Sequence, residues 1–518
     1  MKTKLLPLLV FINFATMAYA NNVSLTNVSV ANNIAGTGKV VQFDLSWENS
    51  WRTTSTGNFD GVWVFFKFKD LDGKWYPLRF NGNNITMPAG FTQDIGNNGA
   101  VTGIGVFIYR NTNGFGTSTL TGVKLGIQSY PGTFEVRGFA LEMVYIPQGS
   151  FWLGDGSSED AYQSSNVGNT PYQVTGQNNI TPGTAAGNLY DPETVLTASF
   201  AGFPTGYNAF WIMKYELSQG GYRDFLNTLT FTQQVSRIAS SPNAAVGTNI
   251  YSGGAGYRQY IEIATPGVSP STPAVVGCDA DGDNIYNEST DGEWITASTI
   301  NWPDMAAYLD WSGLRPMSEF EYEKACRGPI APVANEFAWG TDAIAAYAYT
   351  LTNTNTASES ITNPSAVFGN AINDSSNINY ARGGIFATAT STRVSSGASY
   401  YGVMELTGSA YEQVVGSGFL AGRSYTGKNG DGLLTTLGNA NENFWPGVNG
   451  ITGIAVSPGI YNGGDGVTSD GGTRDRGGNL YSTFDLLKVS HRGGYGTGNV
   501  FQTAKSAFKG IRGVRDAN

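Results

Sequence analysis

The chain has 518 residues with 40 acidic and 30 basic side chains, which gives a formal net charge of −10 at pH 7. That acidity argues against nucleic acids and anionic membrane surfaces as partners. Charged residues make up 14% of the chain, below the ~25% of ordinary globular proteins, and the 69 glycines and 20 prolines indicate many turns and loops. A chain of this length is expected to form two domains, or one large domain with an extension.

Residues 1–20 have the layout of a cleaved secretory signal. Lys2 and Lys4 precede an apolar run over 5–15, and small residues follow at Ala18 and Ala20. The run is shorter than the ~20 residues that a membrane span needs, and no later stretch is long and apolar enough to be one. We therefore expect an exported protein without a membrane span, in the periplasm, at the cell surface or in the medium.

Residues 21–139 carry the pattern of β-strands. Apolar and polar residues alternate over 41–47 and again over 62–68, and the segments 103–109 and 120–127 indicate further strands between glycine- and asparagine-rich turns. Helical periodicity is absent from this region. The pattern predicts an N-terminal all-β sandwich of about 110 residues.

Capping residues predict two helices in the rest of the chain. Ser218 is a suitable N-cap, and apolar residues follow it at helical spacing as far as Leu229. Ser318 and Glu321 form a capping box, in which the hydroxyl accepts from a backbone N–H while the carboxylate reaches back. Gly328 is placed to end that second helix.

An acidic loop follows Cys278 and is a candidate calcium site. Asp279, Asp281 and Asp283 alternate along the chain, and Asn287 comes shortly after them. Their side-chain oxygens, with the backbone oxygen of Ile285, are the hard ligands that Ca²⁺ binds.

The acidic loop does not have EF-hand spacing, because the sixth and twelfth positions hold Asn284 and Thr290 instead of glycine and glutamate. Asp291 or Glu293 could complete the coordination shell. A solvated acidic turn that binds no ion is the alternative, as for any short motif match.

Motifs between residues 141 and 512 occur in the order found in one known family. They are Leu141–Gly154, Phe210–Gln219, Arg315–Gly328, Gly402–Gln413, Arg476–Gly478 and Gly510–Arg512. Together they make the chain resemble the sulfatase-modifying-factor family, to which the formylglycine-generating enzymes belong. The resemblance implies that the β-sandwich of 21–139 precedes an α+β sulfatase-modifying-factor domain over 140–518. That domain is C-type-lectin-like with long loops, and it would carry insertions at about 242–296 and 416–475.

The resemblance also implies structural calcium. In relatives, the segment that matches 402–413 holds the ion through positions equivalent to Glu405, Gly408, Ala410 and Glu412, all of which offer oxygen ligands here. The other interpretation of Glu405 and Glu412 is a general acid–base pair.

A second calcium site of the family would begin near Asn370 and Ala371. The sequence does not place its remaining ligands.

The redox metal centre of the family has no counterpart. Oxidase members bind copper between two cysteine thiolates, and the equivalent positions hold Ser482 and Leu487. No cysteine follows Cys326 in the chain. Iron-dependent relatives use several histidines, whereas His491 is the single histidine here. We therefore expect Ca²⁺ as the cofactor and neither copper nor iron.

The chain has two cysteines, Cys278 and Cys326. In an exported protein, Cys278 could form a disulfide with Cys326 and close a loop of roughly 50 residues. Alternatively, Cys326 could be an inert thiol within a helix core. The sequence leaves both alternatives open.

Family motifs without the metal centre favour a non-catalytic module that binds an unknown protein, peptide or glycan through its loops. Candidate contact residues are aromatic side chains on these loops, namely Tyr461, Tyr481, Phe484, Tyr495 and Phe501. One alternative is an enzyme of the same family with unrecognised chemistry, which could use Glu405, Glu412, Asp485 or His491. Another is a structural component of a surface assembly.

Overall fold

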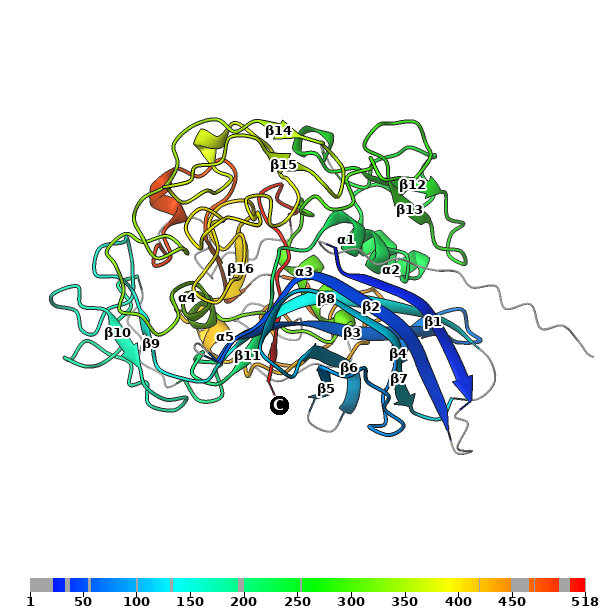
Figure 1. The fold of residues 1–518 in the computed structure, drawn as a ribbon, viewed down its shortest axis with the longest axis horizontal. Helices are drawn as coiled ribbons and strands as arrows, with labels where there is room; N and C mark the ends of the chain where they lie inside the picture. Colours follow the sequence, from blue (N-terminus) through cyan, green and yellow to red (C-terminus); the bar gives the residue numbers. More distant parts are fainter. Residues whose placement is uncertain are drawn as a thin grey trace, which may run out of the picture.

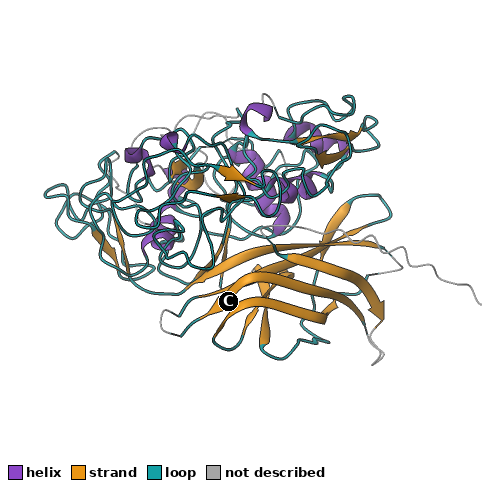
Figure 2. Ribbon diagram, turned by 45° about the horizontal axis from the view of Figure 1, so that its top comes forward, coloured by secondary structure: helices purple, strands orange, loops and turns teal. Residues whose placement is uncertain are grey.

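The computed structural model describes residues 22–32, 38–54, 57–98, 101–130, 134–193, 200–251, 254–418, 420–448, 465–469, 471–492 and 504–517. The predicted signal at 1–20 lies outside these residues, as do Tyr461, Tyr495 and Phe501. The described chain forms a large antiparallel sheet on which a loop-rich body is packed (Figures 1 and 2). It is thus rich in β-structure.

Hydrogen bonds connect ten strands into one sheet. Its main path runs β1-β2-β3-β8-β11-β18, while β7 pairs with β2, β4 and β6 pair with β3, and β5 pairs with β6. The strands are β1 (Ser24–Asn32), β2 (Lys39–Arg52), β3 (Phe59–Lys69), β4 (Trp75–Leu78), β5 (Phe91–Asn98), β6 (Val101–Arg110), β7 (Gly114–Ile127), β8 (Glu135–Ile146), β11 (Phe210–Met213) and β18 (Val514–Asp516). The four strands expected within 21–139 are therefore confirmed, whereas their arrangement as a sandwich stays a prediction.

Strand β3 lies between two apolar cores. Because side chains alternate across a strand, Val62, Val64 and Phe66 pack in an N-terminal core formed by β1–β8, whereas Trp63 and Phe65 pack in the core of the loop-rich body. All five side chains are almost fully buried. The sheet is thus covered on this second face by the rest of the chain.

Strand β8 crosses position 139/140, at which the sequence predicts a domain boundary. Residues Glu135–Tyr145 of β8 pair with β3, and its last four residues, Met143–Ile146, also pair with β11. Strand β18, from the end of the chain, pairs with the other side of β11. Strands from both predicted domains therefore belong to the same sheet.

The loop-rich body contains short helices and strand pairs. The helices are α1 (Gln219–Leu226), α2 (Phe231–Arg237), α3 (Trp302–Ser312), α4 (Glu319–Arg327) and α5 (Leu420–Arg423), with 3₁₀ turns η1 (Gly254–Tyr257), η2 (Asp374–Ser376) and η3 (Phe484–Leu487). The strand pairs are β9 (Phe151–Leu153) with β10 (Tyr172–Val174), β12 (Ile261–Thr265) with β13 (Val275–Cys278), β14 (Leu351–Thr352) with β15 (Ser360–Ile361), and β16 (Glu412–Val415) with β17 (Thr473–Arg476). Long connections join these elements, as the composition predicts.

Both predicted helix starts are confirmed. The Ser218 side chain accepts from the backbone N–H of Gly221 at the start of α1. At α4, Ser318 and Glu321 form both bonds of the capping box, and Gly328 follows with φ of +68°. The capping residues therefore determine where both helices begin and where α4 ends, whereas α1 ends at Leu226, before the predicted Leu229.

Helix α4 is buried along its whole length, although it carries three glutamates. Glu319 accepts from Arg476 at 3.0 Å and from Arg492 at 2.9 Å, and Arg315 binds Glu321 through two nitrogens at 2.9 and 2.7 Å. Burial raises the pKa of Glu319, but the arginines outweigh burial and hold it well below the usual value. Each of these buried charges has a partner of opposite charge.

The third glutamate of α4, Glu323, extends the same network. It accepts from Arg476 at 2.7 Å, from Arg327 at 3.1 Å and from the backbone N–H of Gly154 at 2.8 Å. Arg476 belongs to β17 and Gly154 follows β9, so α4 connects two strand pairs that are remote in the sequence. We call the ion pairs of Glu319, Glu321 and Glu323 the α4 network.

The described parts of the 416–475 insertion are packed into the molecule. Trp445 is 1% exposed and lies in the large core. The carboxylate of Asp310 on α3 accepts from the backbone N–H groups of Asp431 and Asn441, each at 2.9 Å. These contacts attach the insertion to α3.

The two cysteines are separate. Cys278 and Cys326 are both free and both fully buried, in different apolar clusters. Cys326 is therefore a core thiol, which is one of the two alternatives that the sequence leaves open.

Among the residues that the structure describes, no helix has the length and apolar character of a transmembrane span.

Candidate metal and binding sites

The positions equivalent to the copper-binding cysteines are filled. Leu487 is fully buried and packs with Phe337, Trp339 and Ala371. Ser482 is 2% exposed, and its hydroxyl accepts from the backbone N–H of Asn479 at 2.9 Å. An isobutyl group and an engaged hydroxyl supply none of the soft sulfur that copper(I) requires.

The turn before these residues packs closely against them. Gly478 has φ of +72°, and a Cβ atom there would lie 2.4 Å from the Leu487 side chain and 3.1 Å from Cβ of Ser482. The backbone of the turn therefore lies directly against both side chains.

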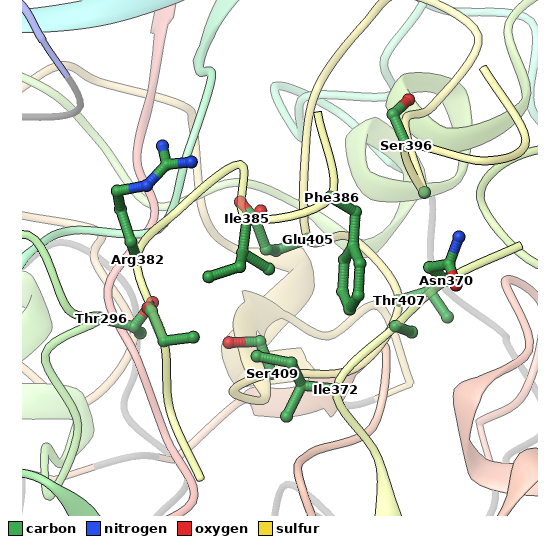
Figure 3. Close-up of a pocket in the computed structure, with 13 residues that line it drawn as sticks. Thr296, Asn370, Ile372, Arg382, Ile385, Phe386, Ser396, Glu405, Thr407 and Ser409 are labelled. Carbon is green, nitrogen blue, oxygen red and sulfur yellow. Dashed lines mark hydrogen bonds between the residues drawn. The ribbon is translucent and has the colours of Figure 1, made fainter. Parts of the chain in front are cut away.

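A different pocket brings together residues from the two predicted calcium segments (Figure 3). It is lined by Thr296, Asn370, Ala371, Ile372, Ala381, Arg382, Ile385, Phe386, Ser396, Gly397, Glu405, Thr407 and Ser409. We call it the Glu405 pocket. In Figure 3, Glu405 and Phe386 lie in its middle, between Arg382 on one side and Asn370 on the other.

Glu405 has one oxygen in use and one without a partner. Oε1 accepts from the backbone N–H of Gly384 at 2.6 Å, whereas Oε2 is buried and accepts from no described donor. Burial raises the pKa of Glu405 to about 7, with Arg512 lowering it and Glu412 raising it. A buried carboxylate oxygen without a donor is costly unless a cation or a proton satisfies it.

The backbone around Glu405 is also constrained. Glu405 has φ of +55° and Ser409 has φ of +65°, in the left-handed region that non-glycine residues seldom adopt. Each such residue costs on the order of 1 kcal/mol and persists only where its surroundings enforce it, often at functional sites.

The structure adds Glu216 to the predicted set. This buried residue accepts from Ser409 Oγ at 2.8 Å and from the Ala410 backbone N–H at 2.9 Å. Burial, followed by the charge of Glu412, raises the pKa of Glu216 to about 8. Glu216 precedes the N-cap of α1, more than 180 residues before Glu405, so no local pattern could have indicated its position.

The predicted ligand Glu412 is paired with an arginine. Its Oε1 accepts from Arg512 Nε at 2.6 Å. Glu216, Glu405 and Glu412 influence one another electrostatically, and Arg512 is the cation that acts on all three. The cluster thus holds more acid than base.

Of the four predicted calcium ligands, Glu405 lines the pocket, whereas Gly408, Ala410 and Glu412 do not. The predicted carbonyl ligands, Gly408 and Ala410, accept no hydrogen bond from a described donor. With Oε2 of Glu405 they offer oxygen ligands without competing donors, which is the donor chemistry that calcium prefers. Glu405, Gly408, Ala410 and Glu412 would hold the ion, and the ion would neutralise the excess acid.

Asn370 is a weaker candidate ligand. Its Oδ1 accepts from Tyr349 Oη and from the backbone N–H of Ser365, both at 2.9 Å, and its amide nitrogen donates to the Ser395 carbonyl at 2.7 Å. The backbone oxygen of Ala371 accepts from Asn373 at 3.1 Å. Both residues line the Glu405 pocket, but these contacts give their oxygens structural roles.

The acidic loop has its carboxylates close together. Ligand atoms of Asp279, Asp281 and Asp283 all lie within 4.8 Å of one another. Asn287 differs, because its Oδ1 accepts from Arg223 at 2.7 Å and from the Cys278 backbone N–H at 3.0 Å. The predicted role of Asn287 as a side-chain ligand is therefore not supported by its contacts, whereas the three aspartates form a compact group.

Asp485 and His491, which the enzyme alternative would use, lie in different surroundings. Asp485 has a side chain that is 79% exposed and pairs with Lys488 at 2.7 Å, which lowers the pKa of Asp485. His491 is 7% exposed, with its backbone N–H bound to the Lys488 carbonyl at 3.2 Å. Neither residue lines the Glu405 pocket.

The two predicted aromatic contact residues within the described chain have different exposures. Tyr481 is 54% exposed and packs edge-on against Tyr257 and Phe508, with ring centroids 6.4 and 5.7 Å away. Tyr257 and Phe508 also contact each other at 5.9 Å. Phe484 is half-buried against the cluster that contains Leu487. An exposed aromatic group therefore exists at Tyr481, and we call it the Tyr481 cluster.

The fold and these sites define a β-rich protein with a long-looped body, a compensated ionic core and candidate cation sites outside that core. Residues 133–516 match the family model of the sulfatase-modifying factor enzyme 1-like domain. The chain therefore belongs to the sulfatase-modifying-factor family. A search of curated proteins finds no match.

Proposed function

We propose that this chain is an exported, calcium-stabilised member of its family that binds a ligand and does not act as a copper oxidase. The observation that carries the proposal is the replacement of the thiolate pair by Ser482 and Leu487, with Leu487 buried in an apolar cluster. Copper-dependent oxygen activation needs those sulfur ligands. A fold can keep its architecture while one chemistry is lost.

Calcium stabilisation is supported by the unpartnered oxygen of Glu405 and by the excess of acid around it. A cation at this point would satisfy an oxygen that otherwise costs about 1–3 kcal/mol. Its positive charge would also offset the repulsion between Glu216, which lies just before α1, and the acids at 405 and 412.

Ligand binding is supported by the Tyr481 cluster. Its rings come from three separate segments, and Tyr481 presents more than half of its surface to solvent. Rigid exposed aromatic rings are effective recognition groups for proteins, peptides and glycans. The described parts of the 416–475 insertion are less suited to binding, because they are packed into the core.

Incubation of the purified protein with copper, dioxygen and a cysteine-containing sulfatase peptide tests the non-catalytic proposal. Mass spectrometry of the peptide should show unmodified cysteine. Conversion of the cysteine to formylglycine would overturn the proposal. A copper-loaded oxidase of the family serves as the positive control.

A second candidate function is an enzyme that uses Glu405 as a general acid–base. The observation in its favour is the pKa of Glu405, which burial raises to about 7, near the value best suited to proton transfer at neutral pH. Chemical activity that depends on Glu405 and persists in the presence of a calcium chelator would favour this alternative over structural calcium.

A further inference from the structure

One segment of the chain, residues 371–382, borders both the Glu405 pocket and the Tyr481 cluster. The pocket is lined by residues at the two ends of this segment, namely Ala371, Ile372, Ala381 and Arg382. The part between the ends leaves the pocket, passes through η2 and returns. We call residues 371–382 the connecting segment.

The connecting segment donates a hydrogen bond to the chain next to each ring of the Tyr481 cluster. These bonds join the Asp374 N–H to the Ser482 carbonyl at 3.3 Å, Asn379 Nδ2 to the Gly256 carbonyl at 2.9 Å, and Tyr380 Oη to the Ala507 carbonyl at 2.7 Å. The three acceptors are the immediate sequence neighbours of Tyr481, Tyr257 and Phe508. Each ring is therefore attached to the same segment through one backbone position.

The connecting segment also shares an apolar core with both sites. That core contains Ile372, Tyr380, Ala381, Ala410 and Leu480, and Tyr257 packs against it. Ala410 is a predicted calcium ligand, whereas Tyr257 belongs to the Tyr481 cluster. Because protein interiors are close-packed, a displacement at one end of this core is transmitted to the other end.

The two sites are nevertheless distinct. None of Tyr257, Tyr481 and Phe508 lines the Glu405 pocket, so an ion in the pocket would not touch the three rings. An effect of the ion on the rings has to pass through the chain between them. The hydrogen bonds and the apolar core of the connecting segment supply that route.

We propose that a calcium ion in the Glu405 pocket orders the Tyr481 cluster through the connecting segment, so that ligand binding depends on calcium. The coupling rests on the proposed function, which places calcium in the pocket and the ligand on the rings. An ion that satisfies Oε2 of Glu405 needs the walls of the pocket in place, so it binds the seated segment more tightly than a displaced one. By linkage, the ligand should in turn raise the affinity for calcium.

Hydrogen exchange of the full chain, with Ca²⁺ itself as the probe, tests the coupling. Backbone amides of the connecting segment and of 256–258, 479–482 and 506–509 should exchange more slowly with calcium, because an opening that displaces the segment must release the ion. At a calcium concentration about one hundredfold above Kd, the slowing approaches about one hundredfold. Amides of the exposed turn at 70–74 should be unaffected.

Tyr380→Phe breaks the route without changing the residues that line the pocket. It removes the hydroxyl that donates to Ala507 but keeps the buried ring. We expect this variant to bind calcium about as tightly as the wild type and to lose most of the calcium protection over 506–509. Tyr425→Phe is the matched control, because its buried hydroxyl donates to the Pro316 carbonyl, also at 2.7 Å, outside both sites. The control should keep both the binding and the protection.

Asn379→Asp is a second variant at a less buried position, for use if Tyr380→Phe folds poorly. The carboxylate keeps an acceptor for the Tyr380 N–H but removes the donor to Gly256. Calcium should still bind to this variant, and the calcium protection over 256–258 should be lost.

Calorimetry on the same samples separates the two ways in which the coupling can fail. If the wild type bound no calcium, the proposed calcium site would fail, and the coupling with it. If calcium bound, and bound more weakly to Glu405→Gln, but exchange over 479–482 and 506–509 did not change, the coupling alone would be overturned. Equal calcium protection over 506–509 in Tyr380→Phe and Tyr425→Phe would also overturn it.

Discussion

The α4 network and the Glu405 pocket both contain buried acids, but they differ in how those acids are compensated. In the α4 network each glutamate has arginine partners, with distances of 2.7–3.1 Å. In the Glu405 pocket, one carboxylate oxygen is unpartnered and several acids share Arg512. The compensated acids hold their segments together, whereas the uncompensated oxygen is the point at which we propose that a cation binds.

The largest effect is expected in the α4 network. Glu319→Gln removes the charge that faces Arg476 and Arg492 and leaves buried guanidinium groups short of a partner. Such a loss typically costs about 3–5 kcal/mol of unfolding free energy. Urea denaturation monitored by tryptophan fluorescence measures it.

Asp485→Asn is the matched control for that variant, because it breaks an exposed pair with Lys488. An exposed pair is worth about 0–1 kcal/mol. If Glu319→Gln cost no more than Asp485→Asn, the α4 network would not have the structural role that we assign to it.

A somewhat smaller effect is expected at the vacated copper position. Leu487→Ala removes a fully buried side chain from the cluster with Phe337 and Trp339. The cavity should lower the unfolding free energy by about 2–4 kcal/mol. An unchanged denaturation midpoint would mean that Leu487 does not fill this position in solution.

Calcium should stabilise the protein through the Glu405 pocket. At a calcium concentration about one hundredfold above the dissociation constant, one site adds about 2.7 kcal/mol to the unfolding free energy. Thermal melting with and without chelator should show the shift, and Glu405→Gln should reduce it. Gln keeps an acceptor for the Gly384 N–H, and Glu48→Gln, at an exposed residue, is the control. If calcium raised the melting temperature of Glu405→Gln as much as that of the wild type, calcium would not stabilise the protein through the Glu405 pocket.

The pair of Glu142 and Lys214 predicts a pH dependence of stability. Both side chains are buried, and Lys214 Nζ lies 2.9 Å from Oε2 of Glu142 and 3.5 Å from Oδ2 of Asp60. Burial raises the pKa of Glu142 from 4.5 to about 7, so the folded state binds more protons than the unfolded state between these values. This contribution to stability is therefore present at low pH and is lost as the pH rises from about 4.5 to 7.

Glu142→Gln tests that dependence, because Gln keeps an oxygen for Lys214 but cannot ionise. We expect the fall in unfolding free energy between pH 5 and pH 8 to be smaller in the variant than in the wild type, by about 1–3 kcal/mol. Denaturation curves at the two pH values measure it. If the difference in unfolding free energy between the two proteins were the same at both pH values, Glu142 would not be the source of the pH dependence.

The smallest effect on stability is expected at the Tyr481 cluster. Tyr481→Ala removes an exposed ring and should change the unfolding free energy by less than about 1 kcal/mol, yet it should reduce ligand binding. Screening on glycan and peptide arrays provides the measurement. Phe115→Ala, which removes a ring that is 77% exposed on β7, is the control. Equal binding by the two variants would exclude the cluster as the contact surface.

Local sequence patterns predicted the parts of the structure that depend on neighbouring residues. Ser318, Glu321 and Gly328 specify α4 because caps act within one turn, and alternation specifies β2 and β3 because each has one face in the N-terminal core. The compact aspartate group at 279–283 follows from spacing alone in the same way.

The candidate sites were less predictable because distant segments complete them. Glu216 joins Ser409 and Ala410 across almost 200 residues, and the side chain of Asn287 turns toward Arg223 of α1 instead of toward the aspartates. The packing of the 416–475 insertion on Asp310 likewise depends on backbone donors that composition does not reveal. Tertiary contacts decide which acids remain without partners.

Metal analysis of the purified chain tests the central claim most directly. After exposure to both calcium and copper followed by dialysis, elemental mass spectrometry should find calcium retained, reduced in Glu405→Gln, and no stoichiometric copper. Retention of one copper per chain with consumption of dioxygen, or the absence of any retained calcium, would contradict the account.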